Sequence, residues 1–366
     1  MRTIQVVNVR WFNATAWYGA FLSRLLREAG HETLFIGLDG TQSFVRAQEW
    51  GLEPVALDLN TASPLRLAAL WGRMRALVRD FRPDVVNCHR GEAFVLWGML
   101  RKAGGRFKLV RTRGDQRLPR NNIPNRWLHC HAADAVVATN SVMARHFRDV
   151  LQVPEQKIHT IYGGVDTAVF SYDESGRQRV RAGYGYGAGD FVLGLLGRFD
   201  RVKGQKELIF AVADLYHRRG LRHVRLMLAG FETATSRAEV EAWIDEAGVR
   251  DITVITGKRE DVAACISAMD AGVVASLWSE TIARAALEIM ACGRPLVSTG
   301  VGVMPDLLPH EALCAEGDVT ALADLLEKTV RDEPWRHWLQ AACVQRMKTL
   351  RERDFLDTTL AMYEQA

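Results

Sequence analysis

Residues 273–303 read VVASLWSETIARAALEIMACGRPLVSTGVGV and carry the clearest structural signal in the chain. A strand-like run at 271–276 leads into a helical pattern, and a second strand-like run follows at 295–298. A strand, a helix and a strand in this order are typical of a parallel sheet whose faces are covered by helices. The stretch therefore predicts an α/β fold.

Two glutamates bracket the start of this helix. Glu280 and Glu288 are eight residues apart, which corresponds to about 12 Å along a helix. The first helical turn lies between them and offers free backbone N–H groups to an anion. This layout suits a ligand with a sugar at one end, a diphosphate in the middle and a ribose at the other. The alternative is two solvated glutamates on a surface helix.

A second motif precedes this one in the chain. Residues 191–206 read FVLGLLGRFDRVKGQK, in which a buried-strand pattern ends at Gly197 and Gly204 opens an amphipathic helix. Arg198 and Lys203 lie between them, and two cations beside a helix start favour an anion site. Arginine can grip a phosphate with two hydrogen bonds, whereas lysine acts as a point charge. The alternative is a basic surface loop.

The alternation of strands and helices continues through both halves of the chain and predicts a parallel sheet in each. Strand-like runs in the first half are 4–9, 33–36, 54–57, 84–88, 108–112, 135–138 and 158–162. Those in the second half are 191–196, 224–229, 252–256, 272–275, 295–298 and 312–314. Helical patterns such as 67–78 separate them, with apolar residues at i, i+3, i+4 and i+7.

Cysteine usage, hydropathy and charge narrow the class of protein. The six cysteines are scattered without C-x-x-C spacing, which favours reduced core residues over disulfides or metal ligands. No apolar run approaches the roughly 20 residues that a membrane span needs, and Met1 leads directly into a strand without a signal peptide.

Residues 1–150 hold 22 Lys+Arg against 12 Asp+Glu, whereas 151–366 hold 25 against 31. The basic first half favours an anionic acceptor or an anionic membrane surface, and no motif supports nucleic-acid binding.

Together the two motifs resemble the donor site of family-4 retaining glycosyltransferases of the GT-B fold. That family has Glu, seven residues and Glu, then Gly-x-Pro-Val-Val, and upstream a Gly-Arg-x-x-x-x-Lys-Gly loop. The residues of this chain that match are Gly197, Arg198, Lys203, Gly204, Glu280, Glu288, Met290, Ala291, Gly293, Pro295 and Leu296. The chain departs from the pattern where Thr281-Ile282-Ala283 replaces Gly-Phe-Gly and Gly302-Val303 replaces Gly-Gly. Both departures touch backbone that should approach the donor.

The resemblance implies a role for each matching side chain. Arg198, Lys203 and Glu280 are the expected catalytic residues, and Gly197, Lys203, Thr281, Ile282, Ala283 and Glu288 are expected to bind the donor. The two cations and the N–H groups near residues 281–283 would stabilise the leaving diphosphate without a metal ion. Glu288 would accept hydrogen bonds from the ribose, and Glu280 from the donor sugar.

The resemblance also implies two doubly wound Rossmann-like domains that face a central cleft. We expect an acceptor-side domain at 1–165, a linker region at 166–190 and a nucleotide-sugar-binding domain at 191–345. One final helix, spanning about 334–365, would carry residues 346–366 back onto the first domain.

Acceptor contacts are expected from loops that follow strands of the first half, because ligands of such sheets bind at the carboxyl ends of the strands. The candidates are Arg10, Asn13, His89, Arg111, Arg113, Asp115 and Arg117. Family members often carry a histidine where this chain has Gly114, so the role of that histidine does not carry over. His89 is an alternative, although a lone histidine at a strand end is more often structural. Aromatic residues of the loop at 10–19 could stack on a sugar or anchor the loop, and Trp17 and Tyr18 favour the core.

The sequence thus predicts a hexosyl- or related glycosyltransferase that uses a UDP-, GDP- or ADP-sugar and a hydroxyl acceptor. The resemblance implies retention of anomeric configuration, with no metal or other cofactor. The basic first half suggests an anionic glycan or glycolipid acceptor, as in lipopolysaccharide-core or other envelope glycan synthesis. We expect a cytoplasmic protein that contacts the inner face of the membrane peripherally and binds no nucleic acid. Two alternatives remain: a nucleotide-sugar 2-epimerase of the same fold, and a non-catalytic sugar-nucleotide-binding protein.

Overall fold

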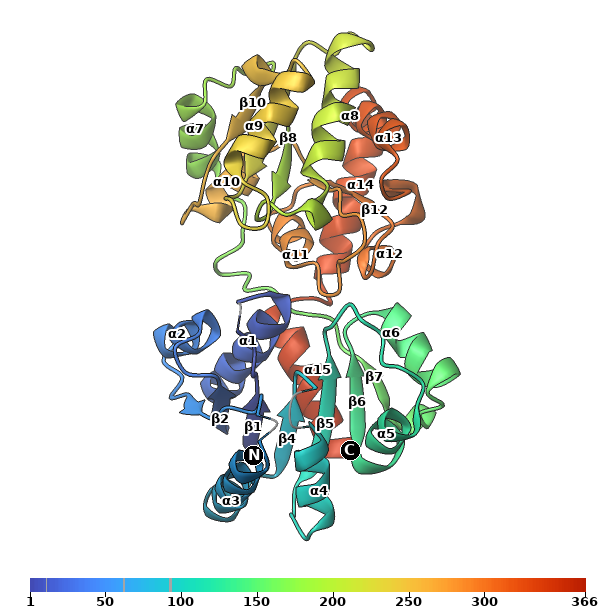
Figure 1. Cartoon of the computed structure of the whole chain (residues 1–366). Coiled ribbons are helices and arrows are strands. Elements are labelled where there is room, and N and C mark those ends of the chain that lie inside the picture. The colour runs from blue at the N-terminus through green and yellow to red at the C-terminus, as the bar shows by residue number, and fades with distance from the viewer. Residues whose placement is uncertain (11, 62, 92–93) are drawn as a thin grey trace. The chain divides into compact units, whose positions relative to one another are not determined.

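The computed structural model describes residues 1–10, 12–61, 63–91 and 94–366, which form two compact units. Unit 1 consists of Met1–Gly163 and Glu352–Ala366, and unit 2 of Gly164–Arg351. Each unit is a parallel β-sheet with helices on both faces (Figure 1). The prediction of two doubly wound α/β domains is confirmed.

The sheet of unit 1 has seven parallel strands in the order β3-β2-β1-β4-β5-β6-β7. They are β1 (Arg2–Val6), β2 (Glu32–Gly37), β3 (Val55–Ala56), β4 (Val85–Cys88), β5 (Lys108–Arg113), β6 (Ala135–Ala138) and β7 (Ile158–Thr160). The central strands are buried on both faces, which is why they read as nearly continuous apolar runs. All seven correspond to strands predicted from the sequence.

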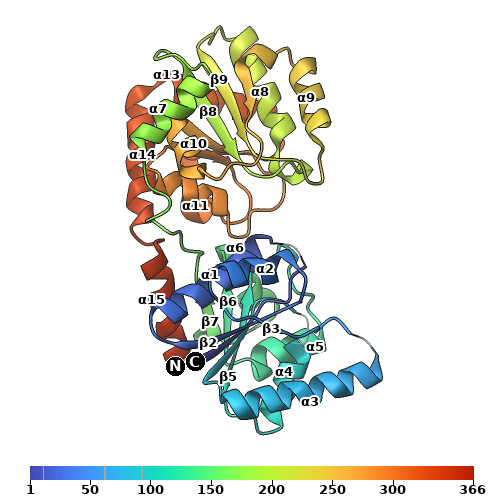
Figure 2. The same ribbon diagram turned by 90° about the vertical axis from the view of Figure 1, so that its left-hand side faces the viewer.

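Helices cover both faces of this sheet. They are α1 (Ala14–Glu28), α2 (Gln42–Glu49), α3 (Pro64–Phe81), α4 (Phe94–Lys102), α5 (Ile123–Arg126), α6 (Ser141–Arg145) and α15 (Glu352–Gln365), with π-helical turns η1 (Trp127–Ala132) and η2 (His146–Val150) and the 3₁₀ turn η3 (Glu155–Lys157). Leu70 and Met74 of α3 share one apolar core with Phe94 and Trp97 of α4. Figure 2 shows α3 and α4 on one side of the sheet and α1 and α15 on the other.

Unit 2 repeats this architecture with six parallel strands in the order β10-β9-β8-β11-β12-β13. The strands are β8 (Phe191–Leu196), β9 (Val224–Ala229), β10 (Thr253–Ile255), β11 (Ala271–Val274), β12 (Leu296–Thr299) and β13 (Leu313–Cys314). The helices are α7 (Glu174–Gly183), α8 (Gln205–His217), α9 (Arg237–Glu246), α10 (Val262–Ala268), α11 (Arg284–Ala291), α12 (Met304–Leu307), α13 (Val319–Arg331) and α14 (Glu333–Met347), with 3₁₀ turns η4 (Arg201–Lys203), η5 (Arg250–Ile252) and η6 (His310–Ala312). The six strands again match the sequence prediction.

Two segments differ from their sequence-based description. Residues 166–190, predicted to be a linker region, contain α7 and pack within unit 2 through Val180 of that helix and Tyr186 after it. Its low apolar content is compensated by arginine contacts to neighbouring carbonyl groups. The predicted single final helix is two helices, α14 in unit 2 and α15 in unit 1, separated by residues 348–351.

The last helix is part of the core of unit 1. The ring of Phe355 on α15 packs edge-on against Tyr18 of α1, with ring centroids 4.6 Å apart. Near the end of α15, the buried hydroxyl of Tyr363 accepts hydrogen bonds from the side-chain amides of Gln5 (3.1 Å) and Asn87 (2.9 Å). The helix is therefore anchored to the two central strands β1 and β4.

Most of the cysteines lie in the interior of the two units. All six cysteines are unpaired, and four of them are buried: Cys88, Cys265, Cys292 and Cys343. No helix in the described part of the chain has both the length and the apolar character that crossing a bilayer requires.

Candidate active site

The two donor motifs meet at the carboxyl ends of β8 and β11. Gly204 opens α8 with a φ of 67°, and a Cβ atom there would lie 1.9 Å from the carbonyl oxygen of Ala275. Only glycine fits this close approach, so the start of α8 can lie against the end of β11. The contact brings the loop after β8 beside the loop after β11.

This approach joins Lys203 directly to Glu280. The Nζ atom of Lys203 donates a hydrogen bond to Oε1 of Glu280, and the Ser276 hydroxyl donates to the same oxygen at 2.6 Å. Glu280 is only 7% exposed, and a carboxylate this buried needs such charge-assisted partners. Two residues that the sequence singled out in separate motifs thus form one ion pair.

The backbone of Glu280 is held as firmly as its side chain. Its carbonyl oxygen accepts a hydrogen bond from the N–H of Val303 at 2.7 Å. Gly302 has a φ of 64°, and a Cβ atom there would lie 2.0 Å from the same carbonyl oxygen. The backbone of Glu280 therefore leaves room only for glycine at position 302.

Arg198 is the more accessible of the two predicted cations. Its guanidinium donates to Oδ2 of Asp200 at 2.7 Å, and its side chain is 45% exposed. Asp200 also accepts from the N–H of Val202 and so caps the turn η4 that carries Lys203. The side-chain amide of Gln205 donates to the Arg198 carbonyl at 2.8 Å, which fixes the loop backbone.

Glu288 lies on the buried face of α11 and is 5% exposed. Its Oε1 accepts a hydrogen bond of 2.6 Å from Nε of Arg284, one turn earlier on the helix. Burial raises the pKa of Glu288, and the Arg284 guanidinium acts in the opposite direction. The result is a buried carboxylate with one cationic partner.

The segment between the two glutamates enters α11 through an unusual conformation. Ala283, the residue before the helix, is left-handed with a φ of 50° and a ψ of 49°. Glycine adopts this region without penalty, whereas other residues lose roughly 1–2 kcal/mol there. The family's Gly-Phe-Gly ends in glycine at this position, whereas this chain places an alanine in the left-handed region. Ile282, the residue before Ala283, is also buried. The N–H groups of the first turn of α11 come directly after these two residues.

The acceptor candidates of unit 1 divide into internal and exposed side chains. Asn13 caps α1, accepting from the N–H of Ala16 at 3.0 Å. His89 has no exposed surface, lies 2.9 Å from Oε1 of Gln5, and has a pKa lowered by burial to about 3. His89 is therefore a neutral structural residue, and the expectation that it meets an acceptor is not supported.

Arg111 is also buried, although the sequence analysis placed it among the residues expected to contact the acceptor. Its fully buried guanidinium donates to the carbonyls of Cys88 and Thr112 and lies over the ring of Phe94 at 5.6 Å. It also reaches Asp115 at 3.4 Å.

The remaining candidates lie nearer the surface. Arg113 donates to the carbonyl of Arg117 at 2.6 Å, and Asp115 also pairs with Arg90 at 3.2 Å. Arg10 and Arg117 are exposed. Trp11, one of the aromatic residues of the first loop, lies outside the described residues, whereas Trp17 and Tyr18 are buried in the core as predicted.

Three residues of the site were missed from the sequence: Ser276, Asp200 and Arg284. The four-residue spacing of Arg284 and Glu288 within a predicted helix indicated their contact. The positions of Ser276 and Asp200 in loops gave no comparable signal. Among the described residues, no group of three His, Cys, Asp or Glu side chains is arranged to hold a metal ion.

Two protein-family models match the chain, one in each unit. The model described as Glycosyltransferase Family 4 matches residues 17–169, and the model described as Glycosyl transferases group 1 matches residues 190–332. Together they cover most of the chain, including both donor motifs.

Individual relatives agree with these models. The chain is 26% identical to the D-inositol 3-phosphate glycosyltransferase of Frankia alni, over 90% of this chain and 75% of that protein. It is 24% identical to the N-acetyl-alpha-D-glucosaminyl L-malate synthase of Bacillus anthracis, over 86% of this chain and 84% of that protein. The crystal structure of Anabaena Alr3699/HepE in complex with UDP has the same fold, with a TM-score of 0.87, 18% identity and complete coverage of both chains. The matched models, the two sheets and the joined donor motifs show that this chain is a glycosyltransferase of family 4 with the GT-B fold.

Proposed function

We propose that the protein transfers a sugar from a nucleoside diphosphate sugar to a hydroxyl group, with retention of the anomeric configuration. The contact between Lys203 and Glu280 is the observation that carries this proposal. It puts a cation suited to a diphosphate beside a carboxylate suited to sugar hydroxyls.

In this proposal the donor diphosphate lies between the cations and the start of α11. Charge develops on the diphosphate as the glycosidic bond breaks. Arg198, Lys203 and the N–H groups near Thr281–Ala283 offset that charge, with the backbone at Gly197 close to the phosphates. Fixed positive groups can do this without a divalent metal ion, so we assign no metal to the reaction.

The two glutamates bind opposite ends of the donor. Lys203 and Ser276 both use Oε1 of Glu280, so we assign Oε2 to the donor-sugar hydroxyls. Arg284 uses Oε1 of Glu288, so we assign Oε2 of Glu288 to the ribose. Carboxylates that accept from hydroxyl groups form strong charge-assisted hydrogen bonds.

The acceptor oxygen attacks the face of the sugar from which the diphosphate leaves. The leaving diphosphate oxygen takes the acceptor proton, so one C–O bond forms and one breaks while the proton moves to the departing phosphate. No side chain of the protein has to act as the general base in this scheme.

Measuring nucleoside diphosphate release tests this function. A thermal-shift screen with UDP, GDP, ADP and their sugars identifies the donor, and UDP is the first choice because the Anabaena neighbour was crystallised with UDP. Addition of an acceptor should then release the diphosphate. Conversion of the donor without any acceptor would indicate a 2-epimerase instead. Tight donor binding without release in the presence of a range of acceptors would indicate a binding protein.

We further propose that the acceptor is an anionic glycan or glycolipid, as in envelope glycan or lipopolysaccharide-core synthesis, and that unit 1 meets it at an anionic membrane surface. The exposed arginines Arg10 and Arg117, with Arg113 beside Arg117, are the side chains assigned to the acceptor. The membrane would lie on the cytoplasmic side, where anionic lipids and the nucleotide sugar are both present.

The outer surfaces of α3 and α4 support the membrane contact. Leu65 on α3 is 84% exposed, and Val95 and Met99 on α4 are 46% and 49% exposed. Arg66 and Arg75 are exposed on the same α3 helix. Apolar side chains flanked by arginines are typical of helices that lie in a membrane interface.

Flotation with liposomes checks this contact. Vesicles containing phosphatidylglycerol should carry the protein, whereas phosphatidylcholine vesicles should not, and Arg66→Glu/Arg75→Glu should abolish flotation. Equal binding to both lipids, or none to either, would contradict the membrane contact while leaving sugar transfer intact.

A further inference from the structure

Unit 2 has a hollow of about 390 Å³ at the amino ends of its strands. Its wall includes Phe191, Asp270 and Pro295, which lie at or just before the starts of β8, β11 and β12. The donor motifs follow the carboxyl ends of β8 and β11, at the opposite edge of the same sheet. The hollow is therefore separate from the donor site.

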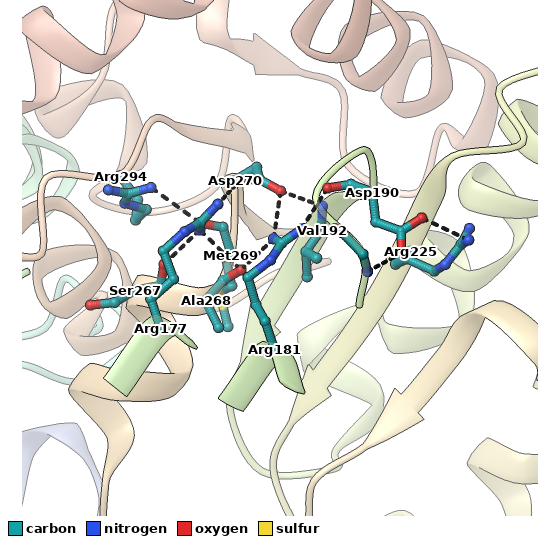
Figure 3. A network of polar contacts seen from close by, with 11 residues as sticks. Arg177, Arg181, Asp190, Val192, Arg225, Ser267, Ala268, Met269, Asp270 and Arg294 are labelled. Carbon is teal, nitrogen blue, oxygen red and sulfur yellow. Dashed lines mark hydrogen bonds and ion pairs between the residues drawn. The ribbon is translucent and has the colours of Figure 1, made fainter. Parts of the chain in front are cut away.

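A network of arginines underlies this hollow (Figure 3). Asp270 accepts from Arg177 at 2.7 Å and from Arg181 at 3.1 Å, and Asp190 pairs with Arg225 at 2.7 Å. Asp270 also accepts from the N–H of Val192 at 2.8 Å. Both aspartates are thus already paired with arginines that are not themselves lining residues of the hollow.

Two further arginines line the hollow and give it a surplus of positive charge. Arg336 lies over the ring of Phe191 at 5.2 Å and donates to the carbonyls of Thr329 and Val330. With Arg294, five guanidinium groups stand against three carboxylates, namely Asp190, Asp270 and Glu174, the last of which interacts with Arg177 and Arg294.

Arg294 is half-buried, and its guanidinium is only partly satisfied by its neighbours. It stacks on Tyr172 at 4.4 Å and makes a long contact of 3.4 Å to the carbonyl of Met269. Its Nε is buried without a hydrogen-bond partner. Burial lowers the pKa of Arg294 and Arg177 acts in the same direction, whereas Tyr172 and Asp270 partly oppose this shift. A half-buried cation in this state costs free energy, and a bound anion would recover it.

We propose that this hollow binds the phosphoryl group of a small phosphate monoester, with Arg294 and Arg336 as its anchors. Arginine binds phosphate oxygens through paired hydrogen bonds, which fits a doubly charged group better than chloride. Gln340 and the rim residues His223 and His337 supply further polar contacts. The hollow is larger than a phosphate ion and is lined in part by Phe191 and Pro295, so an organic group can accompany the phosphate.

The hollow is connected through the polypeptide chain to α11. Arg294 follows α11, which carries Glu288, after only Cys292 and Gly293. A ligand that orders Arg294 therefore contacts the chain at the end of α11. The proposal goes beyond sugar transfer and does not depend on which donor the enzyme uses.

Isothermal titration calorimetry on the full chain tests the proposal. The probes are inorganic phosphate and glucose 6-phosphate, with chloride at equal ionic strength as the blank. Each titration is repeated on Arg198→Ala/Lys203→Ala, in which the expected anion site of the donor is removed. We expect phosphate binding to persist in that variant. Tighter binding of the sugar phosphate would identify a metabolite as the ligand, and equal binding would identify free phosphate.

Substitutions in the hollow locate the binding. Arg294→Gln and Arg336→Gln should each weaken phosphate binding at least tenfold, which corresponds to about 1.4 kcal/mol. Arg218→Gln is the matched control, because Arg218 is 85% exposed on the surface of unit 2 and pairs with Asp214 away from the hollow. Unchanged binding in both hollow variants, or loss of all binding in Arg198→Ala/Lys203→Ala, would overturn the proposal. Circular dichroism checks that each variant is folded.

Discussion

At the scale of single residues, the proposed donor site contains two cations that are already paired with carboxylates of the protein. Lys203 is held by Glu280, and Arg198 by Asp200. In the proposed mechanism these partners pre-position the cations, so little reorganisation is needed when negative charge develops on the diphosphate. We therefore expect the two cations to contribute to turnover and not only to binding.

Removing either cation should therefore slow the reaction. Arg198→Ala and Lys203→Ala should each reduce kcat by roughly 10²-fold, by comparison with the loss of an oxyanion donor. Arg201→Ala is the control, since Arg201 lies in the same loop but pairs with Glu207 at 2.8 Å. Steady-state kinetics with the identified donor measures the effect. Wild-type turnover in either variant would remove that residue from the proposed mechanism.

Substitutions of Glu280 and Glu288 should weaken the binding of different ligands. Glu288→Gln should weaken both the free nucleoside diphosphate and the full donor, because both contain the ribose. Glu280→Gln keeps an oxygen that can accept from Lys203, so it should leave affinity for the free diphosphate nearly unchanged and weaken the full donor. A hydrogen bond to a charged group contributes roughly 1.5–3 kcal/mol, which calorimetry resolves. Loss of diphosphate binding in Glu280→Gln alone would reverse the orientation of the donor.

His89 should make the protein sensitive to acid. Burial holds its pKa at about 3 in the native protein, against about 6.5 in the unfolded chain. Between these values the unfolded chain binds a proton that the native state does not. The free energy of unfolding therefore falls as the pH drops through this range, by at most about 1.4 kcal/mol per unit.

Urea unfolding at pH 7.5 and pH 5 measures this sensitivity. Between these two pH values, the free energy of unfolding should fall by about 2 kcal/mol more in the wild-type protein than in His89→Gln. The exposed His337 provides the control, and His337→Gln should behave like the wild type. An equal loss in His89→Gln would mean that other groups cause the acid sensitivity.

At the scale of helices and strands, apolar runs predicted the sheets well. All thirteen strands were predicted because buried parallel strands must be apolar on both faces. The donor loops were recognisable because glycine and cations stand at fixed spacing beside a helix start. Helix α7 was missed because arginine contacts, rather than apolar side chains, attach it to unit 2.

The roles of the candidate acceptor residues in unit 1 were harder to predict, because they depend on polar contacts between distant parts of the sequence. His89 and Arg111 stand near strand ends, where the sequence leaves both a ligand role and a structural role open. Their actual partners, Gln5 and the carbonyl of Cys88, come from neighbouring strands far away in the sequence. Whether a polar side chain at a strand end faces solvent or the core depends on such partners.

The anchor of α15 gives a prediction at this scale. Tyr363→Phe removes a hydroxyl that serves Gln5 and Asn87 and leaves two buried amides with fewer partners. The free energy of unfolding should fall by about 1–3 kcal/mol. The half-buried Tyr216 of unit 2 supplies the control Tyr216→Phe. A negligible effect of Tyr363→Phe would show that the apolar contacts of α15 are sufficient.

At the scale of the whole molecule, the two units should respond separately to ligands. Each has its own sheet and core, so a single two-state transition is not required. The proposed donor site lies entirely within unit 2. A nucleoside diphosphate at a hundred times its dissociation constant should stabilise that unit by about 2.7 kcal/mol.

Hydrogen exchange followed by mass spectrometry checks this separation. Added protection should concentrate in peptides from 164–351, above all around α11 and the loop after β8. Peptides from β1–β7 that lack contact with the ligand are the internal control. Protection spread equally over both units would contradict a donor site confined to unit 2.

The return of the chain to unit 1 has a consequence for biosynthesis. Unit 2 is continuous in sequence, whereas unit 1 is built from Met1–Gly163 and Glu352–Ala366. On the ribosome, unit 2 can therefore complete its fold while unit 1 still lacks α15. Until residues 352–366 emerge, the surfaces that Phe355 and Tyr363 cover remain open to chaperones and proteases. The first part of the protein to be synthesised is thus the last to be completed.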